Sequence, residues 1–322
     1  MPKVFITREI PEIGPKMLRD KGYEVAIGPE ESISKEDLLK GVKGADAILS
    51  VLTEKIDKEA MDSAGAQLKV VANYAVGYNN IDVAEAKKRN IMVTNTPGVL
   101  TEAVAEHTIA LLFAIAEKIV ESDQYLRDGK FKAWGPKLFL GADIKGKILG
   151  IVGMGRIGSE VARRMQDGFD LKIIYYDLKR DEELEKKFNM EYRALDDLIK
   201  EADFVSIHTA LTPETTHLIN KERLAMMKPE AILINTSRGP IIDEAALVEA
   251  LKQKKIAGAA LDVFEKEPEL ATGLVQLENT VLTPHIASAT KNARDKMAEM
   301  AASNIIAVLE GQPAVNPVPE CQ

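Results

Sequence analysis

Three glycines at the end of an apolar run form the first pattern that could support chemistry. Gly153, Gly155 and Gly158 directly follow Ile151-Val152 and precede residues 159–165, whose apolar positions have helical spacing. In a strand, turn and helix unit, the first glycine allows a tight turn, the second lets a pyrophosphate approach the backbone, and the third allows close helix packing. The free N–H groups of the first helical turn then hold the phosphate charge. The pattern therefore predicts a dinucleotide site.

An acidic residue follows this turn at the distance expected for ribose recognition. Asp177 ends the next apolar run, 19 residues after Gly158, and a carboxylate there can hydrogen-bond the hydroxyls of the adenosine ribose. The same carboxylate repels a 2′-phosphate, so Asp177 favours NAD over NADP as the cofactor. Lys179 and Arg180 keep NADP possible, because either side chain could bind that phosphate if the loop turned toward it.

Three further residues of complementary chemistry lie after predicted strands in the second half of the chain. They are a cation, a carboxylate and an imidazole: Arg238, Glu267 and His285. Because ligands of open α/β sheets bind at the carboxyl ends of strands, we expect these side chains at one site. A permanent cation binds anions, and an imidazole beside a carboxylate exchanges protons near neutral pH. The remaining histidines lack metal-ligand spacing, so we predict no metal site and expect packing or cofactor-adjacent roles for them: His107, His208 and His217.

The elements that must position these residues alternate along the whole chain. Short β-branched runs alternate with amphipathic stretches, which predicts an α/β fold with mostly parallel sheets. Five strands are expected before residue 98 and six more between residues 147 and 283. A long helix over residues 101–128 separates the two series. Its packed face is predicted to comprise Val104, Thr108, Leu111, Leu112, Ile115 and Ile119.

This order predicts two domains, one of them discontinuous. The six-strand series fits a Rossmann-type, doubly wound parallel sheet and defines an NAD(P)-binding domain over residues 100–288. A last helix over residues 291–310 has no strand after it and is expected to return to the first series. Residues 1–99 and 289–322 are therefore predicted to form a smaller, flavodoxin-like α/β domain that binds the substrate. The length of 322 residues agrees with two domains of about 100–200 residues.

The composition excludes several classes of protein. Lys and Arg number 42 and Asp and Glu 50, giving a net charge of −8 without a long basic block, so no nucleic-acid partner is expected. The longest apolar run, residues 109–116, is 8 residues long, whereas a bilayer-spanning helix needs ~20, so no membrane span is expected. Cys321 is the only cysteine and no secretory signal opens the chain, which favours a cytoplasmic location.

Five blocks in the right order resemble the D-isomer-specific 2-hydroxyacid dehydrogenase family, and within it the glyoxylate/hydroxypyruvate reductase branch. The resemblance extends over nearly the whole chain. The blocks are NYAVGYNNID at residues 73–82, LGIVGMGRIG at 149–158, NTSRGPIIDE at 235–244, DVFEKEP at 262–268 and TPHIASAT at 283–290.

The resemblance implies an NAD(P)H-dependent reduction of a small 2-keto acid to the D-2-hydroxy acid. In the family's mechanism the nicotinamide gives a hydride to the keto carbon, while His285 donates a proton to the developing alkoxide. Glu267 stabilises the protonated imidazole and fixes its tautomer, and Arg238 binds the carboxylate and the carbonyl oxygen. The backbone N–H groups of Val76 and Gly77 match the family's clamp for the substrate carboxylate.

The same resemblance assigns a cofactor role to residues outside the glycine turn and Asp177. Arg156 and Ile157 are expected at the pyrophosphate, and Asp262 at the carboxamide of the nicotinamide. The other cofactor residues implied in this way are Thr101, Val104, Thr209, Thr236 and His285.

Two departures from the family pattern leave the substrate open. Ala210 stands where the family usually has proline and Ala287 where glycine is common. A phosphoglycerate dehydrogenase or another D-2-hydroxyacid dehydrogenase is the nearest alternative, although Trp134 and the apolar residues 138–140 favour the branch with smaller substrates. An alternative of another class is a non-catalytic NAD sensor similar to the family's corepressor relatives. The family also implies a homodimer, formed through the cofactor domain and its long helix.

Overall fold

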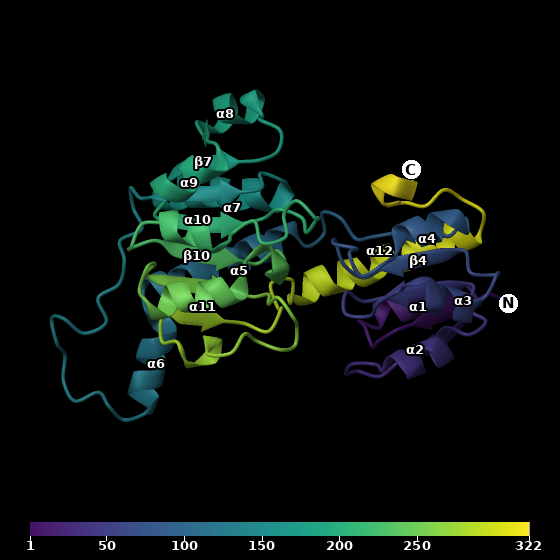
Figure 1. Cartoon of the computed structure of the whole chain (residues 1–322). Coiled ribbons are helices and arrows are strands. Elements are labelled where there is room, and N and C mark those ends of the chain that lie inside the picture. The colour runs from purple at the N-terminus through teal and green to yellow at the C-terminus, as the bar shows by residue number, and fades with distance from the viewer. Residues whose placement is uncertain (322) are drawn as a thin grey trace. The chain divides into compact units, whose positions relative to one another are not determined.

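The computed structural model describes residues 1–321 and divides into two compact units. The first unit comprises Met1–Leu100 and the chain from Ala289 onward, and the second comprises Thr101–Ser288. Each unit is built around one parallel sheet (Figure 1). The predicted α/β fold class is confirmed.

The first unit contains a five-stranded sheet in the order β2-β1-β3-β4-β5. This order is typical of flavodoxin-like folds. Its central strands are buried from end to end, as expected for a parallel sheet covered by helices on both faces. The strands are β1 (Lys3–Ile6), β2 (Glu24–Ile27), β3 (Ala47–Ser50), β4 (Val70–Asn73) and β5 (Met92–Thr94). The helices between them are α1 (Ile13–Asp20), α2 (Lys35–Val42), α3 (Lys58–Ala64) and α4 (Val83–Lys88).

The last helix, α12 (Lys291–Leu309), packs in the first unit although it is far from α1 in the sequence. It contacts α1 and the strands β3, β4 and β5. The hydroxyl of Thr290 accepts a hydrogen bond from the Ala293 N–H and caps its first turn. The buried face of α12 is rich in alanine, which lets the helix lie close to its neighbours.

The second unit contains a seven-stranded parallel sheet in the order β12-β11-β10-β9-β6-β7-β8. The order reverses between β6 and β9, as in Rossmann-type sheets. Six strands match the prediction, whereas β8 was not predicted, because two residues are too few to show a strand pattern. The strands are β6 (Ile148–Val152), β7 (Lys172–Tyr176), β8 (Glu191–Tyr192), β9 (Phe204–Ile207), β10 (Ile232–Asn235), β11 (Gly258–Leu261) and β12 (Thr280–Leu282).

Helices cover both faces of this sheet. One core layer joins it to α5 (Thr101–Ala116) and α7 (Arg156–Phe169) through Leu112, Val161 and Met165. The other joins it to the helices α9 (Leu195–Glu201), α10 (Lys221–Met226) and α11 (Glu244–Lys252). Helix α8 (Glu182–Phe188) has no buried residue.

The single long helix predicted over residues 101–128 is wrong, because the structure divides it into α5 and α6 (Ile119–Arg127). Lys118 between them adopts the left-handed conformation, with φ of 56°. The apolar face ends at Ala116, so burial no longer supports a straight continuation of the helix. Ile119, predicted on the packed face, is 51% exposed. Within the described residues, none of the helices is long and apolar enough to cross a membrane.

Candidate active site

The residues predicted to do chemistry in the second unit lie at one edge of its sheet. All the strands are parallel, so their carboxyl ends share this edge. The segments that leave it carry, in order, Gly153 after β6, Asp177 after β7, Thr209 after β9, Thr236 and Arg238 after β10, Asp262 and Glu267 after β11, and His285 after β12.

His285 and Glu267 form the direct contact that the sequence predicted. The imidazole Nδ1 lies 2.8 Å from Glu267 Oε2, and the two side chains are 23% and 26% exposed. Burial alone raises the pKa of Glu267, but the hydrogen bond and charge of His285, the Phe264 N–H and Arg238 lower it on balance. Glu267 is therefore an anion near neutral pH and fixes the tautomer of His285. With Nδ1 engaged, Nε2 is the nitrogen through which His285 can exchange a proton with a ligand.

Arg238 lies at the same edge and is electrostatically coupled to Glu267. Burial lowers the pKa of the Arg238 guanidinium, and the charge of Glu267 opposes that effect. Its Nη1 donates to the carbonyl of Ser237 at 2.8 Å, while its own carbonyl accepts from Asn235 Nδ2 at 2.9 Å. Arg238 therefore places a cation at this edge, close to the carboxylate of Glu267, although the whole chain is acidic.

Asp262 holds the segment that carries His285, a role that the sequence did not reveal. Its fully buried carboxylate accepts the N–H groups of Ile286 and Ala287, each at 2.8 Å, and the hydroxyl of Thr283 at 2.6 Å. Its backbone carbonyl also accepts the His285 N–H at 2.9 Å. These bonds stabilise His285 in the left-handed region, at φ of 54°, which costs a residue other than glycine about 1–3 kcal/mol. Contact between Asp262 and a nicotinamide stays a prediction.

Helix α5 contributes two side chains to this network. His107 Nε2 lies 3.2 Å from Thr283 Oγ1 and 3.5 Å from the Asp262 carboxylate. Burial raises the pKa of Asp262, but the bonds from His107, Thr283 and the backbone lower it overall. The next residue of the helix, Thr108, has its Oγ1 2.7 Å from Oγ1 of Thr236. Val104, another predicted cofactor residue, is buried and accepts the Thr108 hydroxyl at its carbonyl.

The glycine turn has the shape that a dinucleotide requires. Gly153 adopts φ of 98°, and a Cβ there would lie 2.7 Å from Thr209 N, so the loop after β9 packs directly on the turn. A Cβ on Gly158 would lie 2.1 Å from the carbonyl oxygen of Gly153, whereas one on Gly155 would meet open space. Gly155 is the N-cap of α7 and offers no side-chain acceptor, so the first N–H groups of the helix are left to an anion. This cradle fits a pyrophosphate.

The carboxylate that would recognise the ribose also supports the turn. Asp177 Oδ2 accepts the N–H of Met154 at 2.7 Å, which links the end of β7 to the residue between the first two glycines. Arg180, the candidate ligand for a 2′-phosphate, forms a bidentate pair with Glu185 of α8, with Nε and Nη2 each 2.8 Å from a carboxylate oxygen. The Tyr175 hydroxyl donates to the same carboxylate. These contacts hold the Arg180 guanidinium against α8.

The two remaining histidines, His208 and His217, contact protein side chains that support the fold. Burial lowers the pKa of His208 to about 3, so its ring is neutral, and its Nε2 lies 2.8 Å from Ser206 Oγ. His217 Nε2 lies 3.0 Å from a Glu265 carboxylate oxygen in the loop that carries Glu267. Neither histidine lies among the contacts of the His285 and Glu267 pair.

In the first unit, neutral amides hold the turn that contains Val76 and Gly77. Asn73 Nδ2 donates to the Gly77 carbonyl at 2.8 Å, and Asn95 Nδ2 to the Val76 carbonyl at 2.7 Å. Asn80 Nδ2 reaches the carbonyls of residues 51 and 54, which ties this turn to the loop after β3. Within residues 1–321, no hydrogen bond takes up the N–H of Val76 or of Gly77. The turn therefore presents two backbone donors, as an anion-binding turn must.

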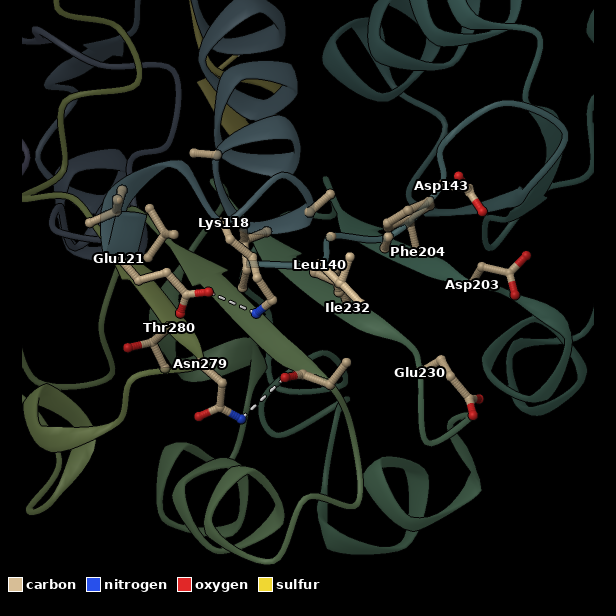
Figure 2. Close-up of a pocket in the computed structure, with 18 of the residues that line it drawn as sticks. Lys118, Glu121, Leu140, Asp143, Asp203, Phe204, Glu230, Ile232, Asn279 and Thr280 are labelled. Atoms are coloured by element: carbon tan, nitrogen blue, oxygen red, sulfur yellow. Dashed lines mark hydrogen bonds and ion pairs between the residues drawn. The ribbon is translucent and has the colours of Figure 1, made fainter. Parts of the chain in front are cut away.

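A cavity of the second unit lies at the other edge of its sheet. It has a volume of about 440 Å³ and is lined at the amino ends of the strands by Phe204, Ile232 and Thr280 (Figure 2). Lys118 and Glu121 pair across its rim at 2.8 Å. Because Arg238, Glu267 and His285 follow the opposite ends of the strands, this cavity is separate from the candidate active site.

Comparison with known proteins decides the family. Residues 109–287 match the model of the D-isomer specific 2-hydroxyacid dehydrogenase NAD binding domain. A glyoxylate reductase of Pyrococcus horikoshii is 54% identical over 316 residues, which cover 97% of this chain and 94% of the relative. The chain belongs to the D-isomer specific 2-hydroxyacid dehydrogenase family. Among other relatives, a glyoxylate reductase of Pyrococcus furiosus is 52% identical over 97% of this chain and 93% of its own length.

Solved structures agree with the fold. A protein of Thermus thermophilus superposes with a TM-score of 0.92 at 46% identity, covering 98% of this chain and 99% of its own. The NADPH-dependent glyoxylate/hydroxypyruvate reductase of Sinorhizobium meliloti, solved with NADP and malonate, gives 0.87 at 31% identity over 99% and 97% of the two chains. The predicted family, the Rossmann-type fold and the nicotinamide dinucleotide cofactor of this dehydrogenase are confirmed.

Proposed function

We propose that this dehydrogenase reduces a small 2-keto acid, with glyoxylate or hydroxypyruvate as the first substrates to test, to the D-2-hydroxy acid. The observation that carries the proposal is the contact of His285 Nδ1 with Glu267 at 2.8 Å, with the partly buried Arg238 electrostatically coupled to Glu267. The names of the relatives, glyoxylate reductase at 50–54% identity over nearly the whole chain, support the same substrate class.

The residues of the site divide the work of such a reduction. The chemistry supplied by a bound reduced nicotinamide is a hydride for the keto carbon. Arg238 binds the carboxylate and polarises the carbonyl, which a planar guanidinium can do with two donors at once. His285 delivers a proton from Nε2 to the developing alkoxide, and Glu267 stabilises the imidazolium before that transfer. The N–H groups of Val76 and Gly77 hold the substrate carboxylate.

The cofactor is held, in this proposal, by the glycine turn and the neighbouring loops. The N–H groups at Arg156 and Ile157 bind the pyrophosphate, and Asp177 binds the adenosine ribose. We assign the nicotinamide side to Thr101, Val104, Thr209, Thr236 and Asp262. NAD is the preferred dinucleotide, because Asp177 is a carboxylate and Arg180 is bound to Glu185.

The two parts of the chain take different roles in this assignment. Residues 100–288 form the NAD(P)-binding domain, and residues 1–99 with 289–322 form the substrate-binding domain. The match of the NAD binding domain model to residues 109–287 supports the first assignment. The free backbone donors of Val76 and Gly77 support the second.

A homodimer and a cytoplasmic location complete the proposal. Large apolar side chains are exposed along residues 119–140, and Trp134, at 81%, is the most exposed of them. Exposed apolar surface of this extent is typical of an interface with a second protein chain. Light scattering should give twice the chain mass of 35.3 kDa, and Trp134→Glu with Leu140→Glu should halve it. The control is Val275→Glu, an exposed apolar position elsewhere in the unit. A monomeric wild type contradicts the dimer.

The single cysteine, Cys321, supports the cytoplasmic location in this proposal.

The decisive experiment is NADH oxidation with a panel of keto acids. We expect turnover with glyoxylate or hydroxypyruvate, and less with phosphohydroxypyruvate. Preference for phosphohydroxypyruvate would indicate the phosphoglycerate branch, and faster turnover with NADPH would contradict the assignment of NAD. A folded protein that binds NADH and turns over no keto acid would support the alternative of a non-catalytic NAD sensor.

A further inference from the structure

Glu244 is a buried acid whose contacts lie away from its own helix. It is the first residue of α11, and it is 4% exposed. Its Oε2 accepts the N–H of Glu265 at 2.7 Å, and its Oε1 accepts the N–H of Ala271 at 2.9 Å. In the reverse direction, its own N–H donates to the Glu265 carboxylate at 3.2 Å.

The two residues that donate to the Glu244 carboxylate lie on either side of Glu267 in the sequence. Glu265 precedes it by two residues and Ala271 follows it by four, so one carboxylate fastens the loop on both sides of the residue that contacts His285. The backbone directly after Arg238 also packs closely against this loop. A Cβ on Gly239, directly after Arg238, would lie 1.9 Å from the Phe264 carbonyl carbon. The loop therefore has little room to shift while Glu244 holds it.

A helix-capping role does not account for Glu244. Asp243 is the N-cap of α11 and accepts the Ala246 N–H at 2.9 Å, so the cap is already supplied by another residue. A buried carboxylate costs several kcal/mol unless hydrogen bonds satisfy it. The donors that satisfy the Glu244 carboxylate are the N–H groups of the Glu267 loop. The buried acid therefore fastens this loop and does not cap its own helix.

We propose that Glu244 is a positioning residue that holds the Glu267 carboxylate against His285, through the N–H groups of Glu265 and Ala271. The proposal rests on the function proposed above and adds a residue to it. Without this hold the loop can move, and the carboxylate no longer stabilises the imidazolium as well. Displacement of a catalytic group by about 1 Å can cost ~100-fold in rate.

The variant Glu244→Gln tests this role at nearly constant volume. The amide keeps one acceptor oxygen but turns an NH2 group toward one of the two backbone donors, so one loop bond is lost. We expect kcat with glyoxylate to fall about 10-fold, with NADH affinity unchanged. The alkaline limb of the pH profile of kcat should move to lower pH. The matched control is Glu249→Gln on α11, an exposed residue paired with Lys252, which should change neither quantity.

A shift of the pH profile can be attributed to Glu267 only if the surrounding charges are known. Arg238 and His285 are the charged groups whose influence Glu267 feels directly. The remaining titratable groups of the region are Glu265, paired with His217, the loop residues Lys266 and Glu269, and Asp262 in the network beneath His285. None of these residues is changed in Glu244→Gln, but the variant itself removes one negative charge. Glu244→Asp keeps that charge and shortens the reach, so a lower midpoint in both variants indicates lost positioning and one in Glu244→Gln alone indicates lost charge. Glu267→Gln sets the largest shift to be expected.

The titration of the His285 ring, followed by NMR in the whole protein, separates this proposal from the proposed function. A lower midpoint in Glu244→Gln and Glu244→Asp than in wild type supports the positioning role even if no keto acid is turned over. A wild-type midpoint and wild-type kcat contradict it, and so does a lower Tm with an unchanged pH profile. If Glu244→Gln does not fold, Glu244→Asp keeps the charge but shortens the reach, and the same outcomes apply to it.

Discussion

The carboxyl edges of the two sheets present donors to an anion by different means. After β4 of the first unit, the side chains of Asn73, Asn80 and Asn95 hold a turn whose free donors are backbone N–H groups. After β10, β11 and β12 of the second unit, the donors are charged side chains. The turn of the first unit is held by neutral amides, although Arg8 and the buried Glu54 lie at the same edge, whereas the second edge contains a cation, an imidazole and several carboxylates around the site.

The two edges differ in the groups that fix the conformation of their loops. Amide side chains can fix a turn without changing the local charge. At the charged edge, the buried carboxylates of Asp262 and Glu244 accept backbone N–H groups from the catalytic loops. Because backbone donors satisfy these acids, neither Asp262 nor Glu244 requires a lysine or arginine as its partner. A lysine or arginine paired with either acid would add a competing cation, and an unsatisfied acid would repel the substrate.

The largest effect should follow from removing the proton donor of the charged edge. His285→Ala should lower kcat with glyoxylate by about 10²–10⁴-fold, because positioned general acids contribute that much. NADH affinity, measured by nicotinamide fluorescence, should stay within about 3-fold, since the glycine turn is untouched. Unchanged turnover would remove His285 from the mechanism.

The next effect tests whether the charge or the shape of the cation matters. Arg238→Lys keeps the charge but loses the two-donor fork, so kcat/KM with glyoxylate should fall by about 100-fold or more. Arg223→Lys is the matched control, because Arg223 pairs with Asp196 on the surface of α10. A decrease of less than about 3-fold in Arg238→Lys would mean that charge alone suffices at this position.

Glu267→Gln should have a smaller effect on rate and a distinct effect on pH dependence. The lowered pKa of Glu267 makes it an anion across the neutral range, where it stabilises protonated His285. Reduction requires that protonated form, so rate is lost as the pH rises and His285 loses its proton. Without the anion this loss should begin at lower pH, with kcat reduced about 10–100-fold at pH 7. If the alkaline limb of the pH profile of kcat moved to higher pH in Glu267→Gln, Glu267 would not be stabilising protonated His285.

Local patterns predicted the strands and the residues that follow them. Arg238, Glu267 and His285 each lie after a short β-branched run, and parallel strands bring such positions together. Two elements were not predicted correctly. Strand β8 is too short to show a pattern, and the break at Lys118 depends on one left-handed residue within a stretch that otherwise favours helix.

The roles of Asp262 and Glu244 as supports could not be predicted, although both lie in the quoted blocks. Their partners are backbone N–H groups, which every residue except proline carries, so no side-chain pattern marks the contact. Glu244 also lies 21 residues from Glu265, and only the packing of two loops brings them together. His107 was predicted to be a packing or cofactor-adjacent residue, and its contact with Thr283 likewise depends on the tertiary fold.

The smallest effect should come from the turn of the first unit that neutral amides hold. Asn80→Ala removes the bonds to the carbonyls of residues 51 and 54, which loosens the turn at Val76 and Gly77 without changing any charge. We expect KM for glyoxylate to rise about 3–10-fold, with kcat and the pH profile nearly unchanged, because the hydrogen bonds of the Asn80 amide to these carbonyls and to the Asn73 side chain are lost. Gln312→Ala, an exposed amide of the same unit, is the control. If Asn80→Ala moved the pH profile as Glu267→Gln does, the turn held by amides would also tune the proton donor, and the contrast between this turn and the charged edge would not hold.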